Sequence, residues 1–183
     1  MTEADPNHRR PMNLVRRALN RVLHLLAMSA PGSESLRPWL HRMRGVKILG
    51  PVFIGDNVYL ENEYPEAIEI HARVQISVRA IILAHTRGPG KVILEKAVFI
   101  GPNAVIACSA GRVLRIGEGA VIGPGCVVTR SVSPRAYLMP HRPEVVAKVG
   151  LPLPLAGSIQ EFIAALRPAV APSSTRDGLS GRD

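Results

Sequence analysis

The chain has 183 residues, enough for one domain with a sizeable core, and carries a formal net charge of +9. Hydrophobic residues make up 46% of it but aromatic residues only 4%, which favours a thin core over a thick globular one. The sequence contains no run of 18 apolar residues, so no transmembrane helix is predicted. The polar residues 1–11 do not resemble a signal peptide. We therefore expect a cytoplasmic protein whose two cysteines, Cys108 and Cys126, are reduced thiols.

Residues 1–44 are predicted to form a basic helical segment. Residues 1–11 have the composition of a disordered terminus. Residues 12–29 favour a helix, because apolar side chains recur on one face of it, at Val15, Leu19, Val22 and Leu26. A second short helix, over residues 35–44, would cap the open end of the repeat that begins at residue 45.

The charge of this segment leaves two interpretations open. Residues 1–47 contain nine Arg and Lys against three Asp and Glu. The helix over residues 12–29 would either lie peripherally on the anionic inner face of a membrane, or pack its apolar stripe on the rest of the protein with its arginines in water. Nucleic-acid binding is disfavoured, because Trp39 is the lone tryptophan of this segment available for stacking on bases.

A six-residue period runs through residues 45–134. Aliphatic residues recur every six positions in four triplets that start 22, 24 and 22 residues apart. A period of six is neither helical nor that of a free strand, and indicates the flat coils of a parallel β-helix, about four in number. The triplets are Ile48, Ile54 and Leu60; Ile70, Ile76 and Ile82; Leu94, Ile100 and Ile106; and Ile116, Ile122 and Val128.

Two other columns of the repeat agree with this interpretation. The fourth position of the hexapeptide holds Asn57, Asn103, Gly119 and Gly125, residue types that tolerate the positive φ of a tight corner. The fifth position holds small or β-branched residues that would fill a narrow interior. Its members are Val52, Val58, Val74, Ala80, Val98, Ala104, Ala110, Ala120, Cys126 and Val132.

The repeat is interrupted after Leu60, Ile82 and Ile106, by 4, 6 and 4 extra residues. All three insertions leave the coils at the same corner, so they would stack into a wall beside the β-helix. Loops on a rigid scaffold are where functional sites are commonly built. Residues 135–183 are expected to leave the coils through a proline-rich segment, with a capping box from Ser158 to Glu161 that starts a helix of about ten residues.

Three segments carry a resemblance to a known family. They are residues 52–58 (VFIGDNV), 98–104 (VFIGPNA) and 120–130 (AVIGPGCVVTR). They resemble the left-handed β-helix hexapeptide-repeat acyltransferases, and the last is similar to the closing coil of the maltose, galactoside and nodulation O-acetyltransferase branch. The resemblance implies an all-β fold of left hand, a homotrimer, and acetyl-CoA-dependent acetylation of a saccharide hydroxyl. The basic N-terminal helix favours a cell-surface polysaccharide or glycolipid precursor over a free sugar as the acceptor.

His85, in the longest insertion, is the candidate catalytic base. The branch carries a histidine on a loop of the middle coils, and a neutral imidazole is suited to deprotonating a hydroxyl near pH 7. Glu63, His85 and Ser109 each stand three residues after an aliphatic position, so in-register coils would place them in one column, with Glu63 orienting the histidine. The neighbouring Glu61, Asn62 and Tyr64 are candidate acceptor-binding residues.

The resemblance also implies a donor site between neighbouring subunits of the trimer. Cations just past the last coil suit the phosphates of acetyl-CoA. The matching positions are Pro102, Ala107, Pro124, Thr129, Arg130 and Lys148. We expect no metal.

Two alternatives remain. A γ-class carbonic anhydrase shares the fold but needs closely spaced histidines on zinc, whereas His71 and His85 are 14 residues apart. A catalytically silent scaffold subunit is the second alternative. The role of His141 stays open, because it stands where the family usually has a different turn. Cys108 is expected to be a buried structural thiol rather than an acyl carrier.

Overall fold

The computed structural model describes residues 14–86, 88–140 and 144–168. The chain divides into two compact units, one ending at Pro140 and one beginning at His141, and each is described by itself.

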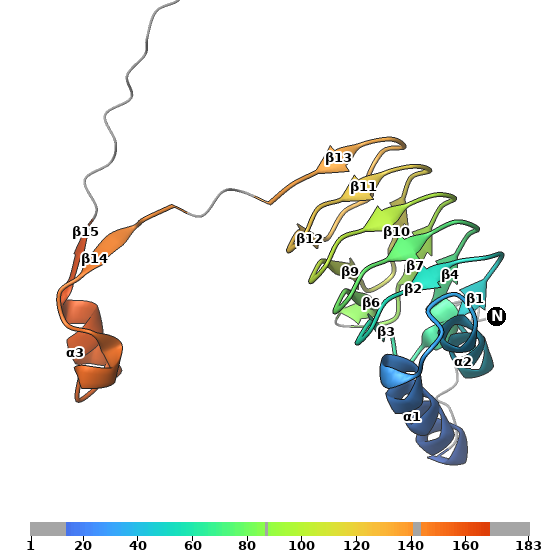
Figure 1. Cartoon of the computed structure of the whole chain (residues 1–183), viewed down its shortest axis with the longest axis horizontal. Helices are drawn as coiled ribbons and strands as arrows, with labels where there is room; N and C mark the ends of the chain where they lie inside the picture. The colour runs from blue at the N-terminus through green and yellow to red at the C-terminus, as the bar shows by residue number, and fades with distance from the viewer. Residues whose placement is uncertain (1–13, 87, 141–143, 169–183) are drawn as a thin grey trace, which may run out of the picture. The chain divides into compact units, whose positions relative to one another are not determined.

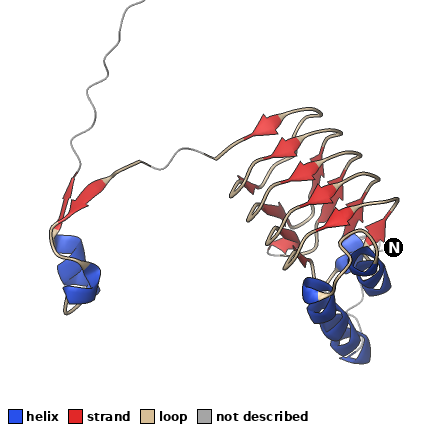
Figure 2. Cartoon of the chain, in the orientation of Figure 1, coloured by secondary structure: helices blue, strands red, loops and turns tan. Residues whose placement is uncertain are grey.

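The first unit is built from short parallel strands that stack into three sheets (Figures 1 and 2). The sheets alternate along the chain, so that each coil contributes one strand to each of them. This architecture confirms the predicted left-handed parallel β-helix of about four coils. The first sheet consists of β1 (Lys47–Ile48), β4 (Ile68–Ile70), β7 (Lys91–Leu94) and β10 (Val113–Ile116). The second sheet consists of β2 (Phe53–Ile54), β5 (Gln75–Ile76), β8 (Phe99–Ile100), β11 (Val121–Ile122) and β13 (Tyr137–Leu138). The third sheet consists of β3 (Tyr59–Leu60), β6 (Ile81–Thr86), β9 (Val105–Ser109) and β12 (Val127–Val128).

The strand register reproduces the six-residue period. Ile48 pairs with Ile70, Ile70 with Leu94, and Leu94 with Ile116, so equivalent triplet members lie above one another. All twelve aliphatic residues of the triplets are buried in one continuous core. The insertions after β3, β6 and β9 therefore leave the coils at one corner, as the sequence predicts.

The corners have the backbone conformation that their residue types allow. Asn57 and Asn103 have φ of 55°, and Gly119 and Gly125 have φ of 68°. Gly101 is required for another reason. A Cβ there would lie 2.7 Å from the backbone nitrogen of Pro124 in the next coil, closer than a non-bonded carbon can approach.

Two details differ from the expectation. Ala110 is exposed, because it lies in the turn of the third insertion, and Leu114 fills the interior two residues before Ile116 instead.

The coils also continue beyond residue 134. Val132 bridges to Ile116, and Leu138 in β13 pairs with Ile122 in β11, each 16 residues on, so the loss of the six-residue spacing after Val128 hides them.

Two helices precede the coils, close to the predicted ranges: α1 (Leu14–Ser29) and α2 (Leu36–Arg44). Gly45, at φ 106°, ends α2 in the left-handed conformation. The two helices pack against each other, and α2 contacts β1 and β2 at the first coil. Arg37 of α2 donates to the carbonyl of Ile54 at 3.0 Å. The expectation for residues 1–11 falls outside the described residues.

The orientation of α1 contradicts one of the two interpretations of its stripe. Asn20, His24 and Ala27 are the buried residues of α1, whereas Val15, Leu19, Val22 and Leu26 are all more than half exposed. The expectation that the apolar stripe packs on the coils is therefore wrong, because polar residues occupy the inward face. Over the described residues, neither helix is long and apolar enough to cross a membrane.

The second unit holds a small hairpin and a helix. β14 (Ala147–Val149) pairs antiparallel with β15 (Leu166–Pro168), and η2 (Leu153–Leu155) and α3 (Ile159–Ala164) lie between them in the chain. Ser158 caps α3 as predicted, accepting from the backbone N–H of Glu161 at 3.2 Å. α3 has six residues rather than about ten, and the hairpin was not predicted. The tail beyond Pro168 lies outside the described residues.

Candidate functional site

The buried guanidinium of Arg44 fixes the first insertion loop, residues 61–64, through hydrogen bonds. Arg44 of α2 is 3% exposed and donates to the carbonyls of Leu60 at 3.2 Å and Glu61 at 2.8 Å. It also donates to the side-chain oxygens of Asn62 at 3.3 Å and Asn20 at 2.9 Å. The planar guanidinium thereby fixes the backbone at the point where the chain leaves β3. The short 3-10 helix η1 (Pro65–Ala67) then leads the chain into β4.

Two histidines beside Arg44 stay neutral. Because Arg44 can only donate, His41 accepts its hydrogen bond through Nδ1, at 2.9 Å. Burial, followed by the charge of Arg44, lowers the pKa of His41 to about 3 and that of His24 to about 4. Burial lowers the pKa of Arg44 to about 10, which leaves it charged near neutral pH. The positive charge beneath the loop therefore belongs to Arg44.

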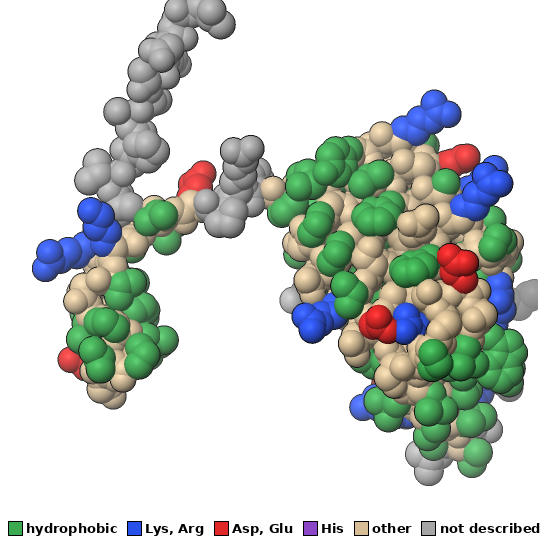
Figure 3. All heavy atoms as spheres, viewed as in Figure 1, with side chains coloured by type: hydrophobic (Ala, Val, Ile, Leu, Met, Phe, Trp, Pro, Cys, Tyr) green, Lys and Arg blue, Asp and Glu red, His purple; other side chains and the backbone are tan. Residues whose placement is uncertain are grey.

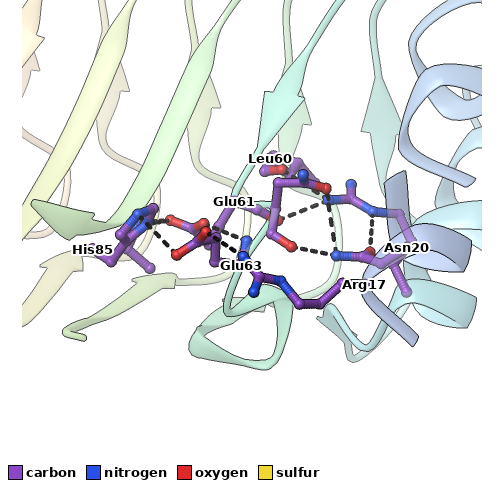
Figure 4. Close-up of polar contacts among 9 residues, drawn as sticks. Arg17, Asn20, Leu60, Glu61, Glu63 and His85 are labelled. Atoms are coloured by element: carbon purple, nitrogen blue, oxygen red, sulfur yellow. Dashed lines mark hydrogen bonds and ion pairs between the residues drawn. The ribbon is translucent and has the colours of Figure 1, made fainter. Parts of the chain in front are cut away.

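Helix α1 contacts the loop from the side. The amide nitrogen of Asn20 donates to the carbonyl oxygen of Asn62 and, at 3.4 Å, to its side-chain oxygen. Arg17 forms an ion pair with Glu63 at 3.3 Å (Figure 4). Arg17 and Glu63 are both more than half exposed, so this ion pair contributes little, whereas the Asn20 contacts are buried. Both α1 and α2 therefore hold the conformation of residues 61–63.

Glu61 is a fully buried carboxylate with three hydrogen-bond donors. The backbone N–H of Ala84 donates to its Oε2 at 3.1 Å, and the backbone N–H of Glu63 donates to its Oε1 at 2.8 Å. The third donor is Nδ1 of His85, which points at Oε2 (Figure 4). A carboxylate accepts and does not donate, so this contact favours the tautomer with the imidazole proton on Nδ1 and the lone pair on Nε2.

His85 lies near the end of β6 with its side chain 30% exposed. Its Nε2 is 3.8 Å from Oε2 of Glu63. The ring of Tyr64 meets the imidazole edge-on, with the ring centres 5.6 Å apart. A histidine whose Nδ1 is anchored on a buried carboxylate and whose Nε2 is bare can act as a general base toward a group placed at Nε2.

The predicted column of Glu63, His85 and Ser109 is only partly formed. Leu60 pairs with Ile82, and Oε2 of Glu63 lies 3.8 Å from Nε2 of His85. The register shifts after Leu83, so that Ser109 pairs with Thr86 instead, and the placement of Ser109 in the column is wrong. The carboxylate at Nδ1 comes from Glu61, which the sequence assigned to acceptor binding, rather than from Glu63. Arg44 and Asn20 were not predicted, because nothing in a helical pattern shows which polar residue turns inward.

The five candidate donor-binding residues of the first unit do not gather at one place. Thr129 and Arg130 line a hollow of about 120 Å³ together with Cys108 and Ser109. Ala107 lies opposite Leu83 of β6. Pro102 and Pro124 occupy stacked turns after β8 and β11, where the N–H of Gly125 donates to the carbonyl of Pro102. Lys148 belongs to β14 of the second unit.

The remaining candidates carry no site in the described residues. No group of three or more His, Cys, Asp or Glu among them is arranged to hold a metal ion. Cys108 is 1% exposed, and its thiol donates to the carbonyl of Arg112 at 3.3 Å, so it is a buried free thiol. His141 lies outside the described residues. A larger hollow, of about 280 Å³, is lined by residues of β2 and β5 and does not include the His85 loop.

Comparison with solved structures finds a likeness to serine acetyltransferase isoform 3 from Entamoeba histolytica, determined in complex with cysteine. The two chains are 15% identical, the likeness covers 69% of this chain and 48% of that one, and the TM-score is 0.29. This chain thus spans about half the length of that enzyme. No family model and no curated protein matches the sequence. A likeness of this extent carries no argument about activity.

The geometry predicts that Arg44 is essential for folding of the loop and that its neighbour Arg42 is not. Arg44→Met leaves the buried carbonyls of Leu60 and Glu61 without this donor and should lower the free energy of unfolding by roughly 3–5 kcal/mol. Arg42→Met, on the same helix, removes hydrogen bonds to the carbonyls of Ile48 and Gly50 at a solvent-exposed side chain and should cost only about 1–2 kcal/mol. Urea unfolding at one protein concentration measures both. Equal stability of the two variants would contradict the assigned contacts.

Proposed function

We propose that this protein transfers an acetyl group from acetyl-CoA directly to a hydroxyl of a saccharide, with His85 as the general base. The observation that carries the proposal is the anchored imidazole. Nδ1 of His85 meets the buried carboxylate of Glu61, and the partly exposed side chain leaves Nε2 accessible near the end of β6. This is the arrangement that acyl transfer to a hydroxyl needs, because a hydroxyl attacks a thioester only as its proton is removed.

The reaction proceeds in two proton transfers through the same nitrogen. Nε2 takes the acceptor's proton while the acceptor oxygen forms a bond to the thioester carbonyl carbon. The tetrahedral intermediate then collapses, the C–S bond breaks, and the imidazolium returns the proton to the departing thiolate, which leaves as free coenzyme A. Glu61 holds the ring in the productive tautomer and stabilises the imidazolium between the two steps.

The acceptor would bind against the first insertion loop. Glu63 presents a carboxylate 3.8 Å from Nε2, so it can accept a hydrogen bond from one hydroxyl while a neighbouring hydroxyl meets the base. Paired hydroxyls are characteristic of saccharides. The ring of Tyr64 offers an apolar surface beside the same imidazole. Asn62 is buried and engaged by Arg44 and Asn20, so it shapes the loop rather than contacting the acceptor.

The donor would approach from the later coils. The hollow lined by Thr129 and Arg130 also contains Ser109, and Ser109 pairs with Thr86, the residue after His85. A thioester bound in this hollow would approach His85 from the later coils, whereas Glu63 belongs to the coil before His85. Arg130 supplies a cation for the phosphates of acetyl-CoA, and in a homotrimer the stacked prolines, Pro102 and Pro124, would line a groove between subunits.

Replacing His85 tests the base. His85→Ala should lower kcat for acetyl transfer by roughly 10²–10⁴ while the protein stays folded, with a melting temperature below that of wild type because the buried Glu61 loses one of its three donors. His71→Ala is the matched control, because His71 is also a half-buried histidine of the coils but pairs with Glu69, away from the loop. Acetyl-CoA consumption is measured across saccharide and amine acceptors. Transfer by His85→Ala within about threefold of wild type would rule out His85 as the base. Absence of transfer from wild type to any acceptor would favour the scaffold alternative.

Two isosteric variants separate the roles of the two glutamates. Glu61→Gln leaves one acceptor oxygen instead of two for the three buried donors. His85 therefore loses its orientation, and kcat should fall by roughly 10²–10⁴. Glu63→Gln should keep kcat within about tenfold of wild type and raise KM for the acceptor. If the two effects are reversed, Glu63 is the residue that orients the base.

A further inference from the structure

Helix α1 turns its apolar side away from the protein. Val15 is 78% exposed, Leu19 57%, Val22 54%, Leu25 60% and Leu26 52%. Four of them, at spacings of four, three and four residues, form one stripe along the helix. In Figure 3, hydrophobic side chains gather over the end of the first unit where Figure 1 shows α1 and α2.

The inward side of α1 explains this inversion. A helix at the surface of a globular protein normally buries its apolar stripe. Here two of the three inward positions are polar, Asn20 and His24, each 4% exposed, and the third is the small Ala27. Asn20 is needed there to hold Asn62 of the first insertion loop. The helix thus packs on the protein by its polar side, and its apolar stripe lies free for another surface.

Helix α2 extends the same feature. Leu36 is 39% exposed, Trp39 52% and Met43 60%, at spacings of three and four residues on one side of the helix. Tryptophan favours the level of lipid headgroups, where its ring is half in water. We define the outward face as these eight apolar residues of the two packed helices.

The charge around the outward face selects its occupant. Residues 14–45 contain six arginines and one glutamate, and Arg16, Arg21 and Arg42 are exposed, whereas Arg17 pairs with Glu63. A second copy of this chain docked face to face would bring like charges together. An anionic lipid surface would pair with the arginines while the apolar stripe enters the boundary between headgroups and acyl chains. We propose that the outward face is a membrane-binding surface for anionic lipid.

This surface lies one helix away from the candidate acceptor loop. The inward side of α1 contacts Asn62 and Glu63, and a helix with its side chains is only about 10–12 Å thick. Lipid bound on the outward face would therefore bring headgroups close to the His85 loop. If the proposed acetyl transfer is correct, this placement favours a lipid-linked saccharide as the acceptor. The membrane proposal itself does not depend on that activity.

The experiment is co-sedimentation of the full-length protein with phosphatidylcholine vesicles that contain or lack phosphatidylglycerol. The test variant, Leu19→Gln/Val22→Gln/Leu26→Gln, changes only exposed side chains and should keep the wild-type melting temperature. The matched control, Val145→Gln/Val146→Gln/Leu155→Gln, removes three apolar side chains of the second unit that are even more exposed. Substitutions are preferred to truncation, because deleting α1 would also remove Asn20 from the loop.

Wild type and control should sediment with the anionic vesicles, and binding should weaken above physiological ionic strength. The test variant should lose at least about tenfold in partitioning, since three apolar side chains no longer enter the bilayer. Equal binding of test and control variants, or no binding by wild type, would overturn the proposal. A change of molecular mass in the test variant, with no vesicle binding by wild type, would assign the outward face to a second copy instead. Acetyl transfer enters none of these readouts, so a failure here is distinguishable from a failure of the proposed function.

Discussion

The hydrogen bonding of the Glu61 carboxylate is the interaction on which the site depends. A buried carboxylate is costly unless donors surround it, and its three donors come from two successive coils. Ala84 and His85 reach it only because Leu60 and Ile82 are in register one coil apart. The regular stacking of aliphatic residues in the interior thus determines where the imidazole sits, and the insertion at that corner leaves its second nitrogen uncovered.

Helices α1 and α2 complete this arrangement, and α1 leaves its apolar side chains exposed as a result. Arg44 holds the carbonyl of Glu61 from beneath, and Asn20 holds Asn62 from the side. To supply these polar contacts, α1 must turn its polar side inward. The exposed apolar stripe follows from that requirement, since both sides of one helix cannot face the coils. One helix thereby links the loop of the candidate site to the surface that we assign to lipid.

The sequence predicts the coils well, because each inward position repeats every six residues and must be aliphatic. It also predicts the corner where His85 leaves the coils. It does not identify the partner of His85, because Glu61 and Glu63 are two residues apart and share one face, and only side-chain geometry distinguishes them. The register shift after Leu83 that displaces Ser109 has no signature in residue type. The inward side of α1 is likewise hidden, because the apolar stripe predicts the opposite orientation.

The most direct test of the central claim is the tautomer of His85. Long-range proton–nitrogen NMR of protein labelled with ¹⁵N-histidine, near neutral pH, distinguishes a protonated ring nitrogen from a bare one. The resonances of His85 are those lost in His85→Gln. The contact with Glu61 predicts a proton on Nδ1 and a bare Nε2. A proton on Nε2 with a bare Nδ1 would contradict the assigned pair and remove the base on which the proposed chemistry rests.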